Sequence, residues 1–213
     1  MRVGIWLARS PRPLESISSG HQVQQQIEAH SAYFPSPIPT LTQTSAITSQ
    51  DHKTLAILDE ILASKNDNDP RLDQDFNALT EGAKTLLREK YKSLAPEKLN
   101  EKGTIVFLLG RNITSERDIG FMRQVLSEPP CFSLTNCKEA PSGSEQSSEE
   151  AGINLTLAYP QIIALKQLSN AMGNPNAFQG SALEVLKSAQ NSPIPLVSKI
   201  STQLVQRFSS LHD

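Results

Sequence analysis

The stretch from residue 95 to 130 constrains the fold most, because its pattern predicts two helices joined by a short turn. Pro96 suits the first position of a helix, and Glu97 places an acid in the first turn, where the helix dipole favours negative charge. The apolar run at 104–109 fits either a buried strand or a buried helix. We favour the helix because no second strand signal lies nearby.

Signals for helix ends follow in the same stretch. Gly110 and Asn112 predict the end of the first helix. Ser115 and Asp118 have the spacing of a capping box, with Asp in place of the usual Glu or Gln. The double proline at 129–130 predicts the end of the second helix. Between these signals runs an apolar stripe at helical spacing, made of Ile119, Met122, Val125 and Leu126.

Two further helices are predicted upstream. The first begins at Asp51, and the second follows Pro70 and runs for about twenty residues to Tyr91. We expect them to pack as an antiparallel pair. Gly82 either allows a close helix crossing or is simply tolerated within the helix. The polar side chains of the second helix are interpreted as a solvated face. The stripes are Leu55, Leu58, Ile61 and Leu62, then Phe76, Leu79, Ala83, Leu86, Leu87 and Tyr91; the polar face carries Glu81, Lys84, Arg88, Glu89 and Lys92.

A diverged repeat follows the central stretch. Aligning Val125 with Val185 gives an offset of 60 residues (185 − 125) that also aligns the flanking helices. About 20 of these residues form a polar insertion, which leaves a unit of roughly 40 residues, the period of HEAT and armadillo repeats. Ser192 and Pro193 predict the N-cap and first position of a last helix. That helix continues the apolar spacing with Val197, Ile200, Leu204, Val205, Phe208 and Leu211.

The segment 181–208, SALEVLKSAQNSPIPLVSKISTQLVQRF, resembles the HEAT-repeat pattern, in which one helix ends, a short proline-containing turn follows and the next helix begins. Lys199 and Ser201 stand where the family often has Arg and Ala. The resemblance covers residues 51–211 and implies an all-α fold, a short right-handed α-solenoid of antiparallel helix pairs with a concave face for a protein partner. Helix phase places five candidate partner-binding residues on this face: Arg117, Arg123, Gln124, Glu184 and Lys187.

Two regions lack this pattern. Residues 1–50 are rich in Pro, Ser, Thr and Gln and predict a poorly ordered N-terminal arm, so the helical domain is expected over 51–212. Residues 131–150 predict a flexible insertion, which holds the only two cysteines of the chain, Cys131 and Cys137. They are interpreted as a disulfide or as two unrelated thiols. A zinc or redox pair is disfavoured, because no CxxC motif or nearby histidine completes the set.

Composition excludes several classes of function. The net charge of −2 and pI near 6.1 lack the basic excess of a nucleic-acid-binding domain. No apolar run reaches the roughly 18 residues of a membrane span. No catalytic motif, cofactor site or metal-ligand cluster stands out, so we expect a non-enzymatic protein–protein interaction or scaffold module. The alternative is a HEAT-like enzyme or accessory subunit that resembles DNA glycosylases or bilin lyases.

Some sequence features favour a location outside the cytoplasm, and one favours the cytoplasm. A cysteine pair in a hydrophilic loop and a Ser-, Thr- and Gln-rich composition favour a periplasmic or secreted location. The lack of a clear signal peptide favours the cytoplasm instead.

Overall fold

The computed structural model describes residues 46–139, 155–173 and 178–210. Most of the predicted N-terminal arm lies outside these ranges, since residues 1–45 are not among them. Within the described part, Thr48 caps the first helix, because its hydroxyl accepts a hydrogen bond from the N–H of Asp51 at 3.2 Å.

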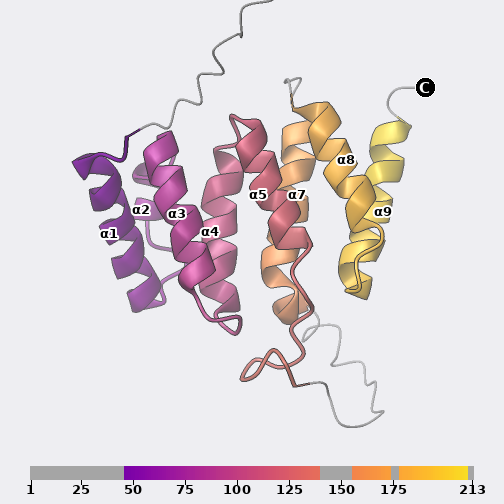
Figure 1. The fold of residues 1–213 in the computed structure, drawn as a ribbon, viewed down its shortest axis with the longest axis horizontal. Coiled ribbons are helices and arrows are strands. Elements are labelled where there is room, and N and C mark those ends of the chain that lie inside the picture. Colours follow the sequence, from indigo (N-terminus) through magenta and orange to yellow (C-terminus); the bar gives the residue numbers. More distant parts are fainter. Residues whose placement is uncertain (1–45, 140–154, 174–177, 211–213) are drawn as a thin grey trace, which may run out of the picture. The chain divides into compact units, whose positions relative to one another are not determined.

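The described residues are helical and contain no strand, so the predicted all-α class is confirmed (Figure 1). The helices are α1 (Ser49–Ser64), α2 (Arg71–Gln74), α3 (Glu81–Ser93), α4 (Leu99–Arg111), α5 (Glu116–Leu126), α7 (Tyr159–Gly173), α8 (Gln179–Ala189) and α9 (Pro195–Ser209).

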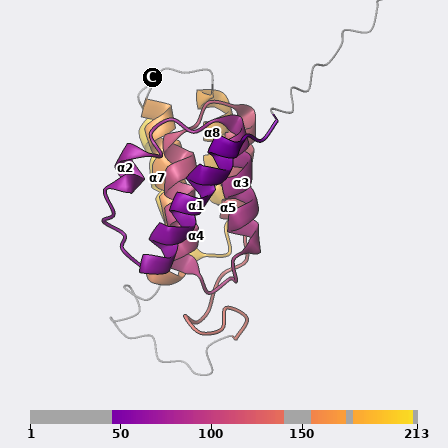
Figure 2. The ribbon, with the colours of Figure 1, turned by 90° about the vertical axis from the view of Figure 1, so that its left-hand side faces the viewer.

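The helices lie in two layers that alternate along the chain (Figures 1 and 2). The first layer holds α1, α3, α5 and α8, and the second holds α2, α4, α7 and α9. An ion pair between Lys84 and Asp118 joins the first turns of α3 and α5. A hydrogen bond of 2.8 Å between Ser181 and Glu116 joins the first turns of α8 and α5. These three helices of the first layer therefore run in the same direction.

The two segments related by the 60-residue offset lie next to each other, because α4 packs against α7 and α5 against α8. The approach of α4 to α7 is close. A Cβ added to Gly103 would collide with the ring of Tyr159, and one added to Gly110 would collide with the side chain of Gln167. Gly110 lies inside α4 and does not end it. Of the two residues predicted to end this helix, only Asn112 lies at its end. The narrower expectation of a right-handed solenoid stays a prediction.

The first two long helices run parallel, so the predicted antiparallel pair is wrong. The carboxylate of Asp51, in the first turn of α1, accepts a hydrogen bond from the hydroxyl of Thr80, the N-cap of α3. Further along, Lys90 of α3 pairs with Asp59 of α1 at 2.7 Å. The close approach expected at Gly82 is present, since a Cβ there would collide with the Asp51 carboxylate.

The second upstream helix is shorter than predicted, because α3 begins only at Glu81. The side chain of Asn112, at the end of α4, accounts for the interruption. It accepts a hydrogen bond from the N–H of Leu79 at 3.0 Å and donates one to the carbonyl of Phe76 at 2.9 Å. These backbone groups are satisfied by a distant part of the chain, so the segment does not need helical hydrogen bonds.

Two other helices begin later than predicted. α4 starts at Leu99, so Pro96 and Glu97 precede it, and α9 starts at Pro195 rather than Pro193. In each case the chain first makes a tight turn with its own hydrogen bond. These bonds run from the N–H of Lys98 to the carbonyl of Ala95 (3.0 Å) and from the N–H of Ile194 to the hydroxyl of Ser192 (3.2 Å).

The predicted apolar stripes supply the core between the layers. The stripe of α5 is buried as expected, and so are Leu58 and Ile61 of α1 and Val197 and Phe208 of α9. Each fully buried side chain of this size stabilises the fold by about 2 kcal/mol relative to exposure. Leu211, the last member of the α9 stripe, lies outside the described residues.

Candidate functional site

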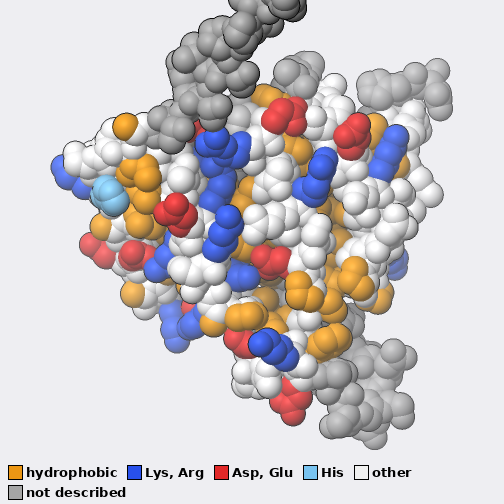
Figure 3. Space-filling view, viewed as in Figure 1, with side chains coloured by type: hydrophobic (Ala, Val, Ile, Leu, Met, Phe, Trp, Pro, Cys, Tyr) orange, Lys and Arg blue, Asp and Glu red, His pale blue; other side chains and the backbone are white. Residues whose placement is uncertain are grey.

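The five predicted partner-binding residues lie on two neighbouring helices of the first layer, α5 and α8. All five are exposed: Arg117, Arg123 and Gln124 on α5, and Glu184 and Lys187 on α8. Because α5 packs against α8, we call the exposed side of these two helices the α5–α8 face. The outer side of the first layer is seen in Figure 3.

A groove of about 410 Å³ borders this face between α3 and α5. Its walls include Arg88 and Lys92 from α3 and Arg117 from α5, while Glu89 adds an acidic group. Gly120 also lines the groove, and a Cβ added there would meet no atom within 4 Å. The α3 residues of the groove were not among the predicted partner-binding residues.

A buried ionic cluster lies where α3 meets α5. The ammonium group of Lys84 donates hydrogen bonds to Glu81 and Asp118 at 2.9 Å each and to Thr114 at 2.6 Å. All three of its donors are therefore used. Arg88 donates to the other carboxylate oxygen of Asp118. The side chains of Lys84 and Arg88 are only 1% and 10% exposed, so the prediction that they face solvent is wrong.

Asp118 is the centre of this cluster, and its side chain is fully buried. It also accepts hydrogen bonds from the N–H groups of Thr114 and Ser115 at 2.9 and 3.0 Å, which confirms its predicted capping role. Burial raises the pKa of this carboxyl, but the bond from Thr114 and the pairing with Lys84 and Arg88 outweigh it. The pKa therefore lies below its ordinary value of 3.8, and the carboxylate is ionised at neutral pH.

A sequence signal for the cluster was present. Lys84 and Arg88 share one helix face with Leu87 and Tyr91, because these four positions follow the i, i+3, i+4 and i+7 spacing of a buried stripe. Charged side chains on such a stripe require buried partners of opposite charge. The identity of that partner was not readable from local spacing, since Asp118 lies in another helix.

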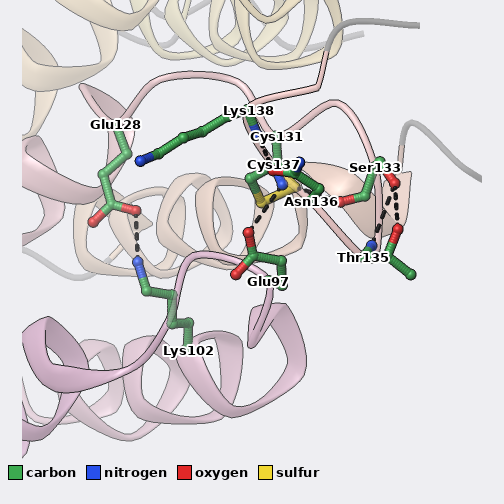
Figure 4. Close-up of a disulfide and its surroundings, with 9 residues drawn as sticks. All are labelled: Glu97, Lys102, Glu128, Cys131, Ser133, Thr135, Asn136, Cys137 and Lys138. Carbon is green, nitrogen blue, oxygen red and sulfur yellow. Dashed lines mark hydrogen bonds and ion pairs between the residues drawn. A yellow bond between two sulfur atoms is a disulfide. The ribbon is translucent and has the colours of Figure 1, made fainter.

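The cysteines close a loop directly after α5. Their Sγ atoms lie 2.06 Å apart, so the structure places Cys131 and Cys137 at disulfide distance. The N–H of Cys137 donates to a carboxylate oxygen of Glu97 at 3.0 Å, which ties the loop to the segment before α4 (Figure 4). This hydrogen bond also lowers the pKa of Glu97. Of the predicted flexible insertion, residues 131–139 are described and residues 140–150 are not.

The described ranges hold neither a metal-binding cluster nor a membrane-spanning helix. No group of three His, Cys, Asp or Glu side chains within these ranges is placed to hold a metal ion. No helix there has both the length and the apolar character to cross a bilayer.

No protein-family model matches the chain, and neither the curated proteins nor the solved structures compared with it gave a match. The packing and the surfaces of the chain itself are therefore the basis for assigning a function.

Proposed function

We propose that this chain is a non-enzymatic protein-interaction module, built as a HEAT-like right-handed α-solenoid, whose partner docks on the α5–α8 face. The alternating layers support the solenoid, as does the placement of α4 beside α7 and of α5 beside α8. The parallel run of α1 and α3 fits as well, because equivalent helices of successive units run in the same direction. In this arrangement α2 takes the second-layer position between them.

The observation that carries the proposal is the exposure of all five candidate side chains on two adjacent, well-packed helices. Arginine, which supplies two of the five, is enriched in protein–protein interfaces. The charges are mixed, since Glu184 lies on the same face as Arg117 and Arg123. Figure 3 shows acidic side chains among the basic ones on this side. A mixed face favours a protein partner over nucleic acid, which requires a continuous positive surface.

The test compares two double charge reversals. Arg117→Glu with Arg123→Glu changes the α5–α8 face. Lys166→Glu with Lys199→Glu is the matched control, because both lysines are exposed on second-layer helices. Proteins cross-linked to the wild-type chain in its native host are identified, and the strongest candidate is purified and titrated against each variant.

We expect the face variant to bind that partner about tenfold more weakly, while the control binds like wild type. Equal affinity of all three proteins for the partner would place the interface elsewhere and contradict the proposal.

The disulfide supports a periplasmic or secreted location for the module, because such bonds persist in oxidising compartments. The check is the intact mass of protein taken from the native host with its free thiols blocked. We expect the mass to rise by two hydrogen atoms when a reductant is added afterwards. Two blocked thiols before reduction would favour the cytoplasmic alternative.

A further inference from the structure

The groove between α3 and α5, which we call the α3–α5 groove, is built on the buried ionic cluster. Its volume is about 410 Å³, and Arg88 of the cluster forms part of its wall. The pair of Lys84 and Asp118 joins the first turns of the two helices at 2.9 Å. A wall that is already fixed in this way binds a ligand without a large loss of conformational freedom.

Arg88 keeps donors for a ligand although most of its side chain is buried. The side chain is 10% exposed, and its Nη2 atom pairs with Asp118. The Nε atom is enclosed and out of reach of a ligand. The Nη1 atom is not enclosed and has no acceptor among the described residues, so its N–H groups face the groove that Arg88 lines. A guanidinium held in place by one carboxylate therefore offers these donors to a second one.

Two exposed cations line the groove together with Arg88. Lys92 comes from α3 and Arg117 from α5, and neither forms an ion pair within the described part of the chain. Figure 3 shows basic side chains in a row between these two helices. Glu89 is the only exposed acid among the described residues that line the groove. The open side of the groove is therefore mainly basic.

Counting the buried groups as well leaves one positive charge in excess. Three cations line the groove, and Glu89 and the buried Asp118 supply two negative charges. The other two members of the cluster, Lys84 and Glu81, balance each other. This excess suits one carboxylate better than a phosphate group, which carries close to two negative charges at neutral pH.

The α5 wall leaves room for the main chain that carries such a carboxylate. Gly120 is exposed, and open space surrounds the position where its Cβ would lie. Phe121, which is 4% exposed, adds an apolar surface next to it. One turn further along α5, the exposed side chain of Gln124 provides both a donor and an acceptor for a peptide group.

We propose that the α3–α5 groove receives one aspartate or glutamate side chain of the partner protein. The carboxylate accepts hydrogen bonds from Nη1 of Arg88 and is attracted by the unpaired charges of Lys92 and Arg117. The main chain of the partner passes over Gly120. Arg117 also belongs to the α5–α8 face, so this inference rests on the proposed function and names the chemistry that the partner presents there.

The experiment titrates the ¹⁵N-labelled full chain with the capped pentapeptide Gly-Gly-Glu-Gly-Gly. The matched probe has Gln in place of Glu, and inorganic phosphate is titrated separately at the same low ionic strength. The backbone amides of Thr85 and Gly120 and the side-chain amide of Gln124 report on the groove. We expect these signals to shift with the Glu peptide. The Gln peptide should bind about tenfold more weakly, because hydrogen bonds to charged groups are the stronger kind.

Two variants change the groove in opposite directions. Glu89→Gln removes the competing acid and should tighten binding of the Glu peptide about threefold. Lys92→Glu should abolish the advantage of the Glu peptide over the Gln peptide. Lys53→Glu is the matched control, since it makes the same charge change at an exposed residue of α1 that does not line the groove. A gain of affinity in Glu89→Gln cannot come from misfolding.

Several outcomes would overturn the proposal. They are equal binding of the Glu and Gln peptides, a Lys92→Glu variant that keeps the preference for Glu, and larger shifts with inorganic phosphate than with the Glu peptide at equal concentration. The test of the proposed function is separate, because it reverses Arg117 and Arg123 and measures the native partner. A native partner that is weakened by that double reversal but not by Lys92→Glu would contradict only the present inference.

Discussion

At the scale of single residues, the buried ion cluster shows how α3 and α5 are fixed against each other. The charged groups of Lys84 and Arg88 are removed from water, and each forms an ion pair with Asp118. Burying charges is favourable only when every charge is paired and hydrogen-bonded, and losing one member leaves the others uncompensated. The cluster therefore specifies the alignment of two helices that belong to the same layer and are separated in sequence by α4.

Replacing Asp118 by Asn should lower the free energy of unfolding by about 3 kcal/mol, because Lys84 and Arg88 would lose their buried counter-ion. Urea denaturation of the two proteins measures the difference. Asp73→Asn is the matched control, since the Asp73 side chain is 81% exposed in its ion pair with Arg111. Exposed pairs contribute at most about 1 kcal/mol. Equal effects of the two substitutions on the free energy of unfolding would show that the buried cluster contributes no more stability than an exposed ion pair.

The same carboxyls predict how stability depends on pH. The pKa values of Asp118 and Asp51 lie below the ordinary value of 3.8 in the folded protein. The unfolded chain therefore takes up protons more readily. The stability from these groups is present in full above the unfolded pKa and is lost as the pH falls through the folded pKa.

Urea denaturation at about pH 5 and about pH 3 should accordingly show a fall in stability that is smaller in the Asp118→Asn variant. Identical losses in wild type and variant would mean that the native-state pKa of Asp118 is not lowered.

The sequence predicted the contacts of single residues correctly when the contacting residue lies nearby in the chain, and incorrectly when it lies far away. Ser115 and Asp118 are three positions apart, so their capping interaction was predictable. Lys84 and Arg88 find Asp118 only after the chain has passed through α4, and their charge alone suggested a solvated face. The helix phase of these two residues indicated burial instead, because it places them on the same face as Leu87 and Tyr91.

At the scale of helices, close packing between α4 and α7 depends on glycine. Gly110→Ala should destabilise the protein by about 1–3 kcal/mol, because the added Cβ meets the inner carbon atoms of Gln167. Gly120→Ala in α5 is the control, since open space surrounds that position. Alanine there should stabilise the helix by up to about 1 kcal/mol. Thermal unfolding of both variants is the measurement, and a stabilising Gly110→Ala would contradict the described packing.

Helix existence was more predictable than helix boundaries. The apolar stripes located α1, α5 and α9, because periodic burial is a property of the local sequence. The run at 104–109, which lies in α4, was assigned to a helix because no strand signal lies nearby. The break before α3 was missed because its cause, Asn112, caps the end of the next helix and satisfies the backbone of Leu79 and Phe76. The start of α4 was missed because residues 95–98 form a tight turn of their own before the helix, and Glu97 in this turn accepts a hydrogen bond from Cys137. The first error comes from a contact between distant parts of the chain, which a local pattern does not contain.

At the scale of the whole helical unit, helices pack both on consecutive helices and on the next helix of the same layer, as α4 does on α7. α9 packs on α7 and α8 and contributes Val197 and Phe208 to the core. In a repeat protein, stability is a sum of units and of the interfaces between them. The layered order was partly predictable from the 60-residue offset, whereas the parallel run of α1 and α3 was not, because the short α2 gave no signal of a second-layer position.

A chain that stops at Ser192, before α9, should unravel from that end. Hydrogen exchange of backbone amides should accelerate by more than about tenfold in α7 and α8 while α1 and α3 keep their protection. Gln203→Ala, a change of an exposed residue on α9, is the control and should leave exchange unchanged. A uniform loss of protection over all helices would instead indicate a single cooperative unit.

The loop bond also determines the sulfur chemistry of the chain. Cys131 and Cys137 are the only cysteines in the sequence, and the bond occupies both. The oxidised protein therefore has no nucleophilic thiolate and does not couple covalently to other molecules through sulfur. A cysteine introduced on an exposed helix position would be the only reactive thiol, so one spin label or fluorophore would attach at a known place. Pairs of such labels would report directly on the spacing of the helices in solution.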